Sequence, residues 1–132
     1  MRFTRTFTAG PAHIDELGHV NNAVWVQWME DIAVAHWRAL ASPDDQAAYV
    51  WFITRHEIDY RGSLHEGETV TAETWVPEPP RGARFDRHIR FVDEAGKTLV
   101  EAKTTWAILD AATRRLLRVP RHFEALFLSP SS

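Results

Sequence analysis

The chain has 132 residues, enough for one domain of moderate size, and we expect residues 1–132 to form a single domain. Its formal net charge of −3 argues against nucleic acid as a partner, because phosphate-binding surfaces usually carry a basic excess. Without cysteine, the chain has no disulfide, no thiol nucleophile and no cysteine-based zinc site. It has neither a long apolar run nor a signal-peptide pattern, so we expect no membrane contact and a cytoplasmic location.

The first third of the sequence predicts one strand and one long helix. Residues 2–8 alternate, with Phe3 and Phe7 on one face, and end at a Gly-Pro breaker. From residue 23 to about residue 41 apolar side chains recur at helical spacing, and further valines widen the apolar surface beyond one stripe. We therefore expect a helix that is covered on several sides. The Ser-Pro-Asp-Asp segment at residues 42–45 predicts a stop and a turn.

The remainder of the chain changes to the period of strands. Alternating β-branched and aromatic residues, separated by turns rich in glycine and proline, predict strands at 51–60, 69–76, 84–92 and 97–109. A last short strand is predicted around residues 115–119, and residues 121–128 fit a short helix or a tail. The fold class is therefore α+β, with an antiparallel sheet of about five strands wrapped around one long helix. Because such a sheet has open edges and the helix carries spare apolar surface, we expect at least a homodimer.

The densest chemistry lies in residues 15–22, Asp-Glu-Leu-Gly-His-Val-Asn-Asn, directly before the helix. A carboxylate can activate water or attack a carbonyl carbon, and unpaired N–H groups at a helix start can polarise the carbonyl oxygen. Asp15 supplies the carboxylate, although an aspartate here can also cap the turn through its own backbone. His19 could orient substrate or water, or form a local hydrogen bond. Asn21 or Asn22 is expected as the N-cap that aims the N–H groups.

A resemblance to a known family covers nearly the whole chain. It is carried by residues 15–22 together with 55–60 (Arg-His-Glu-Ile-Asp-Tyr), 67–70 (Gly-Glu-Thr-Val) and 104–110 (Thr-Thr-Trp-Ala-Ile-Leu-Asp). Through these runs the chain resembles hotdog-fold acyl-CoA thioesterases of the 4-hydroxybenzoyl-CoA thioesterase-like family. The resemblance implies a hotdog fold, subunits that pair through their sheets, and a site at the subunit interface.

The same resemblance implies roles for individual residues. The aspartate three residues before the glycine is a general base or nucleophile in that family, and Asp15 occupies its position. Backbone N–H groups at the helix start polarise the thioester carbonyl there, and these correspond to Asn22 and Ala23. Some members use a glutamate on the helix instead, so Glu30 is the second candidate, with Asp31 beside it. Either of these two could also be a solvated or interface-paired residue.

Substrate binding has candidates of two kinds. The phosphates of coenzyme A need cations, and four arginines lie near the loops that flank the middle strands, namely Arg61, Arg81, Arg84 and Arg87. Arg81 and Arg84 are preferred because they flank a glycine in a loop, although each could equally keep a sheet edge soluble. Trp25 and Trp28 could line an acyl pocket or simply belong to the core.

Other chemistries lack their motifs. The spacing of His13, Asp15 and His19 fits no regular metal site, and Ser63 lacks the Gly-x-Ser-x-Gly elbow of serine hydrolases. No Gly-x-Gly-x-x-Gly run is present either. We therefore expect no metal and no cofactor.

The sequence thus predicts an acyl-CoA thioesterase that releases a carboxylic acid and free coenzyme A and acts as a homodimer or homotetramer. Three alternatives stay open, namely an acyl-carrier-protein thioesterase, a hotdog dehydratase and a non-catalytic module that binds acyl thioesters. Dehydratases of this fold usually pair a histidine with a helix carboxylate. A carboxylate placed before the glycine favours hydrolysis.

Overall fold

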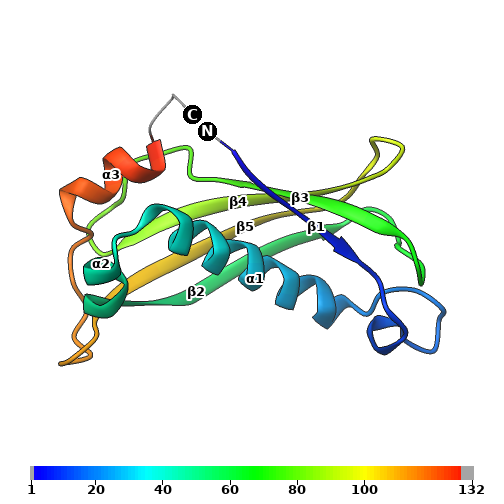
Figure 1. Cartoon of the computed structure of the whole chain (residues 1–132), viewed down its shortest axis with the longest axis horizontal. Helices are drawn as coiled ribbons and strands as arrows, with labels where there is room; N and C mark the ends of the chain where they lie inside the picture. Colours follow the sequence, from blue (N-terminus) through cyan, green and yellow to red (C-terminus); the bar gives the residue numbers. More distant parts are fainter. Residues whose placement is uncertain (1, 129–132) are drawn as a thin grey trace.

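The computed structural model describes residues 2–128, and its main element is a five-stranded antiparallel sheet packed against one long helix (Figure 1). In chain order the elements are β1 (Phe3–Thr8), a 3-10 turn η1 (Pro11–His13), α1 (Asn22–Leu40), α2 (Pro43–Ala48), β2 (Tyr49–Tyr60), β3 (Thr69–Trp75), β4 (Arg84–Asp93), β5 (Thr98–Asp110) and α3 (Arg121–Leu128). The predicted α+β class and the single long helix are confirmed.

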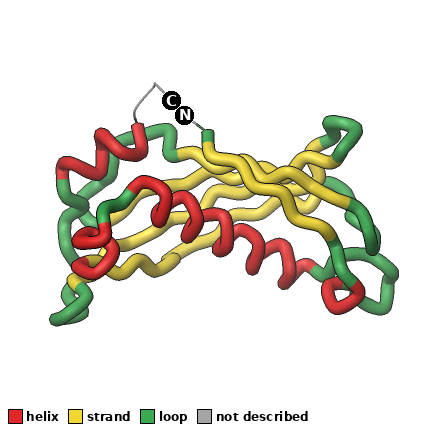
Figure 2. Tube along the Cα trace, in the orientation of Figure 1, coloured by secondary structure: helices red, strands yellow, loops and turns green. Residues whose placement is uncertain are grey.

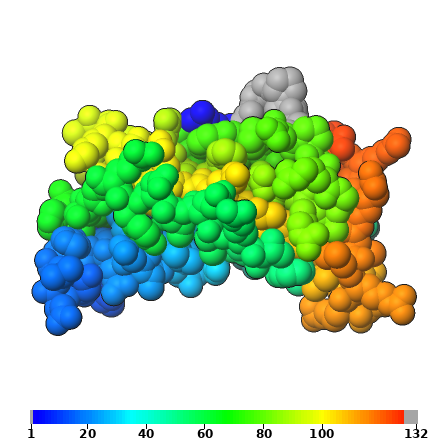
Figure 3. Space-filling model, turned by 180° about the vertical axis from the view of Figure 1, so that it is seen from behind, coloured from blue at the N-terminus to red at the C-terminus, as the bar shows by residue number. Residues whose placement is uncertain are grey.

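The strands follow the order β1-β3-β4-β5-β2, and every neighbouring pair is antiparallel. Helix α1 runs along one face of this sheet, while α2 and α3 lie together near the carboxyl end of α1 (Figure 2). From behind, the molecular surface consists mainly of the strands and their connecting loops, coloured green to orange (Figure 3). The sheet therefore has one face on the helix and one face open, as its alternating pattern requires.

Strand β4 illustrates how alternation builds the core. Its residues Phe85, Arg87, Ile89 and Phe91 are buried, whereas the side chains between them are partly exposed on the outer face. Apolar side chains of α1 meet this inner row in two clusters, one around Trp28 and one farther along the helix. Arg87 therefore lies in the inner row of β4, between Phe85 of one apolar cluster and Ile89 of the other.

The predicted stop of the long helix is confirmed, because α1 ends at Leu40. The predicted turn at residues 42–45 and the predicted strand at residues 115–119 were wrong. Residues 42–45 open the short helix α2, because the Ser42 hydroxyl accepts the Asp45 N–H at 3.1 Å and Pro43 occupies the first turn. Residues 115–119 form no strand, and only Leu116 makes an isolated bridge, to Leu109. Next to this bridge the Leu117 N–H donates to the Ile108 carbonyl at 3.0 Å and the Asp110 N–H donates to the Arg115 carbonyl at 2.9 Å, but the pairing does not continue into a ladder.

Strand β2 is one of the two edges of the sheet, since β5 is its one partner strand among residues 2–128. It is twelve residues long and carries a register shift between Ile53 and Arg55. Phe52 on this strand and Val34 on α1 are exposed apolar side chains, at 41% and 39%. Along the same edge the molecule thus leaves both backbone groups and apolar surface uncovered. Among the helices of residues 2–128, none is long and apolar enough to cross a membrane.

Candidate functional site

The loop before α1 is a tight turn closed on itself. The Asp15 N–H donates to the His19 carbonyl at 3.0 Å, and Ile14 forms a bridge with Val20. The Asp15 side chain accepts the Leu17 N–H at 2.9 Å through Oδ1, so the capping role considered from the sequence is real. Gly18 adopts a φ of 87°, a conformation that favours glycine. Asp15 is partly exposed, and its Oδ1 is held by the turn while it faces solvent.

One bond to a distant segment and two bonds to nearby residues fix the position of this loop. The Val20 N–H donates to the Leu64 carbonyl at 2.8 Å, and the Asn21 N–H donates to the His13 carbonyl at 3.0 Å. The His13 ring is occupied as well, because its Nδ1 accepts the Gly10 N–H at 2.9 Å. The loop and the start of α1 are thereby held as one unit.

Asn21 is the N-cap of α1, as one of the two expected asparagines. Its side chain accepts the Ala23 N–H at 2.8 Å, and its carbonyl accepts the Val24 N–H at 2.9 Å. The N–H of Asn22 has no acceptor among residues 2–128, and Asn22 is exposed. Of the two predicted donors, Asn22 therefore has a free N–H, whereas that of Ala23 is used by the cap.

Tyr60 is a neighbour of this helix start that was not among the predicted site residues. The Tyr60 hydroxyl donates to the Asn22 carbonyl at 3.4 Å, and burial raises the pKa of that hydroxyl. The contact joins the end of β2 to the first turn of α1. Tyr60 ends one of the sequence runs that carried the resemblance, which is the only signal that could have indicated it.

His19 lies beside a second histidine. The rings of His19 and His65 are 6.1 Å apart at their centroids, and the Glu68 carboxylate accepts bonds from the backbone and the ring of His65. The bond from the His65 N–H and then that from its ring lower the pKa of Glu68. Within residues 2–128, no three histidine, aspartate or glutamate side chains gather as a metal site would require.

Glu30 stands apart from the Asp15 loop. By helical rise it lies about 12 Å from Asn22 along α1. Together with Val34 it lines a hollow beside β2, where His56 also lies, and the Nδ1 atom of His56 is buried without a partner. Its neighbour Asp31 accepts a bond from Gln27 at 3.0 Å. A helix carboxylate and an imidazole thus face the same hollow at the β2 edge.

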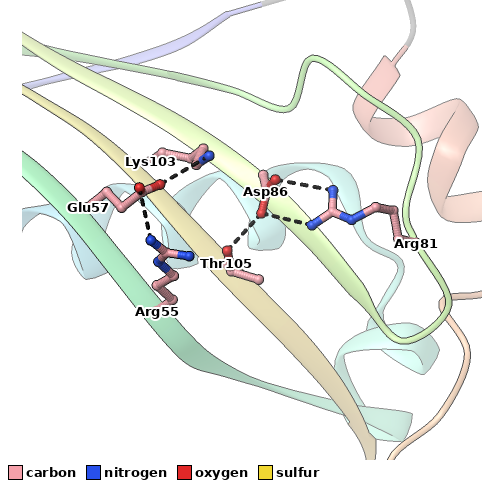
Figure 4. Close-up of polar contacts among 6 residues, drawn as sticks. All are labelled: Arg55, Glu57, Arg81, Asp86, Lys103 and Thr105. Atoms are coloured by element: carbon pink, nitrogen blue, oxygen red, sulfur yellow. Dashed lines mark hydrogen bonds and ion pairs between the residues drawn. The ribbon is translucent and has the colours of Figure 1, made fainter.

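Two of the four predicted coenzyme A arginines are paired with acidic side chains of the same chain. Arg61 contacts Glu101 at 3.1 Å, and Arg81 contacts Asp86 at 3.1 Å (Figure 4). Burial would raise the pKa of Asp86, but the bonds from Arg81 and Thr105 outweigh it and lower that pKa. The same outer face carries a second network, in which Glu57 bridges Arg55 and Lys103 (Figure 4).

Arg84 is exposed, and no ion pair reaches it from residues 2–128. The loop of Arg81 and Arg84 packs near Val119, whose N–H donates to the Gly82 carbonyl at 2.8 Å. That end of the molecule carries α2 and α3, and the Asp15 loop lies at the other end of α1 (Figure 1). Within one chain the predicted base and these two arginines are therefore far apart.

Two further candidates lie in the interior. Trp25 is only 1% exposed and packs edge-on against Trp28 and Phe91, so it serves the core. Its predicted substrate contact stays a prediction. Arg87 was expected near the loops, but it is 2% exposed and faces α1. The expectation failed because arginines are rarely buried without an acidic partner.

Comparison with known proteins gives the class of this molecule. A profile of the thioesterase-like superfamily matches residues 9–127. The 1,4-dihydroxy-2-naphthoyl-CoA thioesterase of Synechocystis superposes with a TM-score of 0.82 at 14% identity, covering 100% of this chain and 99% of that one. The Staphylococcus aureus protein SAV2348, solved in complex with CoA, gives a TM-score of 0.82 at 19% identity, covering 96% and 81%.

A curated relative matches over a shorter stretch. The chloroplast palmitoyl-acyl carrier protein thioesterase of Arabidopsis thaliana is 31% identical over 72 residues, which are 54% of this chain and 17% of that protein. The chain therefore spans only a small part of the curated relative's length.

The fold is that of the hotdog thioesterases, as the resemblance implied. The chain belongs to the thioesterase-like superfamily.

Proposed function

We propose that the protein hydrolyses an acyl-CoA thioester to a carboxylic acid and free coenzyme A, with Asp15 as general base or nucleophile. The observation that carries this proposal is the free N–H of Asn22 at a capped helix start, a few residues after Asp15 in one rigid loop. This N–H lies at the positive end of the helix dipole and can donate a hydrogen bond to a developing oxyanion. An oxyanion donor of this kind typically lowers a barrier by about 3 kcal/mol.

The other site residues take supporting roles in this proposal. Ala23 can join as a second donor only when Asn21 releases its N–H, so Asn22 is the first donor. His19 would orient the attacking water or the substrate from the same loop. Glu30 is the alternative carboxylate, because it faces the hollow beside β2 together with His56.

A homodimer formed through β2 would complete the proposed site. A two-fold axis pairs identical edges antiparallel, so the Tyr60 end of β2 in one copy would meet the Tyr49 end in the other. Tyr60 lies at the start of α1, and Tyr49 lies at the end that carries Arg81 and Arg84. The Asp15 loop of one copy and the arginines of the other would then approach each other, and the arginines could bind the phosphates of coenzyme A. Two such dimers could form a tetramer.

Coenzyme A is preferred over acyl carrier protein as the carrier on two grounds. The similar Synechocystis and Staphylococcus aureus structures are described with CoA thioesters or CoA. Arg81, in the loop before β4, and Arg84, the first residue of β4, also offer cations for phosphates at the end of the molecule that the Asp15 loop of the second copy would approach in the proposed dimer. The Arabidopsis relative is named for acyl carrier protein, so this carrier is the second candidate.

The test is release of free thiol from acyl-CoA and acyl-carrier-protein substrates of several chain lengths and from aromatic acyl-CoA. We expect Asp15→Asn to lower kcat by about 10²-fold or more, as loss of a general base does. Glu16→Gln, which removes a neighbouring exposed carboxylate from the same loop, is the matched control and should retain activity. Full activity in Asp15→Asn together with inactive Glu30→Gln would transfer the role to Glu30. Binding of acyl-CoA without any turnover in the wild type would instead indicate a binding module.

A further inference from the structure

A pocket near the carboxyl half of α1 lies apart from the Asp15 loop. It has a volume of about 210 Å³ and lies between α1, β2, β4, β5 and α3. Its wall is mainly aromatic and is formed by Trp37, Tyr49, Trp51, Phe85, Trp106 and Phe127. A dry cavity of roughly 150 Å³ already admits benzene, so this pocket has room for a ring or several methylene groups.

One charged side chain borders this apolar pocket. Arg87 is 2% exposed, and its guanidinium carbon lies 5.8 Å from the ring centre of Phe85 and 5.7 Å from that of Phe127. Burial lowers the pKa of Arg87 to about 9, so the guanidinium still carries its charge at neutral pH. An uncompensated charge in such surroundings is costly.

No carboxylate of residues 2–128 pairs with Arg87. Its Nη1 atom donates to His36 Nδ1 and to Thr74 Oγ1, each at 2.9 Å. Both acceptors are neutral. Thr74 carries a hydroxyl group, and burial and then the charge of Arg87 lower the pKa of His36 to about 3. These two bonds hold the guanidinium in place but leave its charge unbalanced.

The opposite side of the guanidinium has free donors. Nε is buried without a partner, and Nη2 makes no hydrogen bond to residues 2–128. An N–H from each of these atoms forms the parallel fork that binds a carboxylate in a bidentate manner. In the same pocket wall the Nε1 atom of Trp51 is also buried without a partner. Two side chains at one pocket thus have donors with no acceptor in the described chain.

We propose that Arg87 and the aromatic pocket together bind an organic carboxylate, with the carboxylate on the guanidinium and an apolar body of several carbons against the aromatic rings. Two sources share this chemistry. One is the distal carboxylate of a dicarboxylic acyl group, which rests on the proposed function and would define the substrate. The other is a free carboxylic acid that binds as product or effector.

The first experiment measures binding of octanoate and of 1-octanol, which has the same chain length without the charge. Tryptophan fluorescence is a suitable signal, because three tryptophans line the pocket. We expect the wild type to bind octanoate about 10-fold or more tightly than 1-octanol, as a charge-assisted hydrogen bond provides. Equal affinity of the wild type for the two probes would overturn the proposal.

Variants locate the contact. Arg87→Gln should reduce the preference for octanoate to about one, since the charge that discriminates the probes is removed. Arg90→Gln, on the same strand but on the outer face and paired with Glu73, should keep the full preference. Val34→Trp, at the exposed rim of the pocket, should weaken octanoate binding while Arg87 remains. If Arg87→Gln does not fold, the wild-type preference and the Val34→Trp result decide, and unchanged binding in Val34→Trp would contradict the proposal.

A kinetic comparison separates the two sources. With suberyl-CoA and octanoyl-CoA, which differ by the distal carboxylate, a wild-type preference for suberyl-CoA that Arg87→Gln abolishes assigns the site to the substrate. Equal kcat/KM for the two thioesters together with tight octanoate binding assigns it to a free acid. Octanoate binding in a protein without thioesterase activity would contradict the proposed function and leave the carboxylate site intact.

Discussion

The pH dependence of stability offers a sharp test of the buried polar cluster around His36. This imidazole is 2% exposed, accepts a bond from Arg87 and stacks on Phe3 at 4.9 Å. Because its pKa falls from 6.5 to about 3 on folding, the native protein keeps it neutral where the unfolded chain binds a proton. Stability from this group is therefore complete well above pH 6.5 and is lost as the pH falls toward 3.

The size of the effect follows from the two pKa values. Between about pH 7.5 and pH 5, protonation of the unfolded chain at this one site lowers the free energy of unfolding by about 2 kcal/mol. This pH range lies above the range in which protonation of Glu73 and Asp86 changes the stability, because the pKa values of both carboxyls are lowered. In Glu73, bonds from Arg2 and Arg90 outweigh the opposing effect of burial.

The assay is urea unfolding, followed by tryptophan fluorescence at fixed protein concentration, at several pH values in this window. The matched variant is His36→Asn, whose Oδ1 can replace Nδ1 as acceptor for Arg87 but does not titrate. We expect His36→Asn to be less stable at neutral pH, because it loses the ring contacts with Phe3 and Phe127. Its pH slope should be shallower than that of the wild type by the 2 kcal/mol estimated above. Identical slopes in the two proteins would refute the reasoning.

Two further predictions concern the helix start and the sheet edge. Asn21→Ala removes the cap and should cost about 1 kcal/mol in urea unfolding, whereas Asn21→Asp, which keeps the acceptor, should not; equal losses would show that the cap contributes nothing. Phe52→Lys places a charge on the free edge of β2 and should convert the proposed dimer to monomers in light scattering, with loss of thioesterase activity. Leu116→Lys, an equally exposed position away from that edge, is its control, and a dimer that survives Phe52→Lys would exclude this interface.

Much of the fold could be predicted because the signals are local. The alternation of β4 and the helical spacing of α1 identify their elements without reference to any partner. The strand predicted at 115–119 failed for the opposite reason. Arg115 and Leu117 do bond to β5, but the pairing ends after one bridge, and how far a pairing continues depends on the partner strand and not on a local pattern. In α2, Ser42 and Pro43 are signals of a helix start. The helix is only six residues long, so these signals are also typical of a turn.

The candidate site shows the same difference between local patterns and contacts that depend on the fold. Asp15, Asn21 and Asn22 are neighbours in sequence, so their juxtaposition could be predicted. Tyr60 reaches Asn22 only through the topology of the sheet, and no local pattern announces that contact. Arg87 could have been identified by its place in the inner row of β4, but residue type alone suggested a surface cation.

Most bonds of the Asp15 loop are local, but the bond that docks the loop on the rest of the molecule comes from a distant part of the chain. Val20 donates to Leu64, and Ala9 and Gly67 join the end of β1 to the turn before β3. Such contacts close long loops of chain, so they form late and slowly compared with a helix or a hairpin. During refolding, the helix and much of the sheet can be present while this loop is still open. Recovery of enzymatic activity should therefore lag behind recovery of the far-UV circular dichroism signal, which makes activity a reporter of the final folding step.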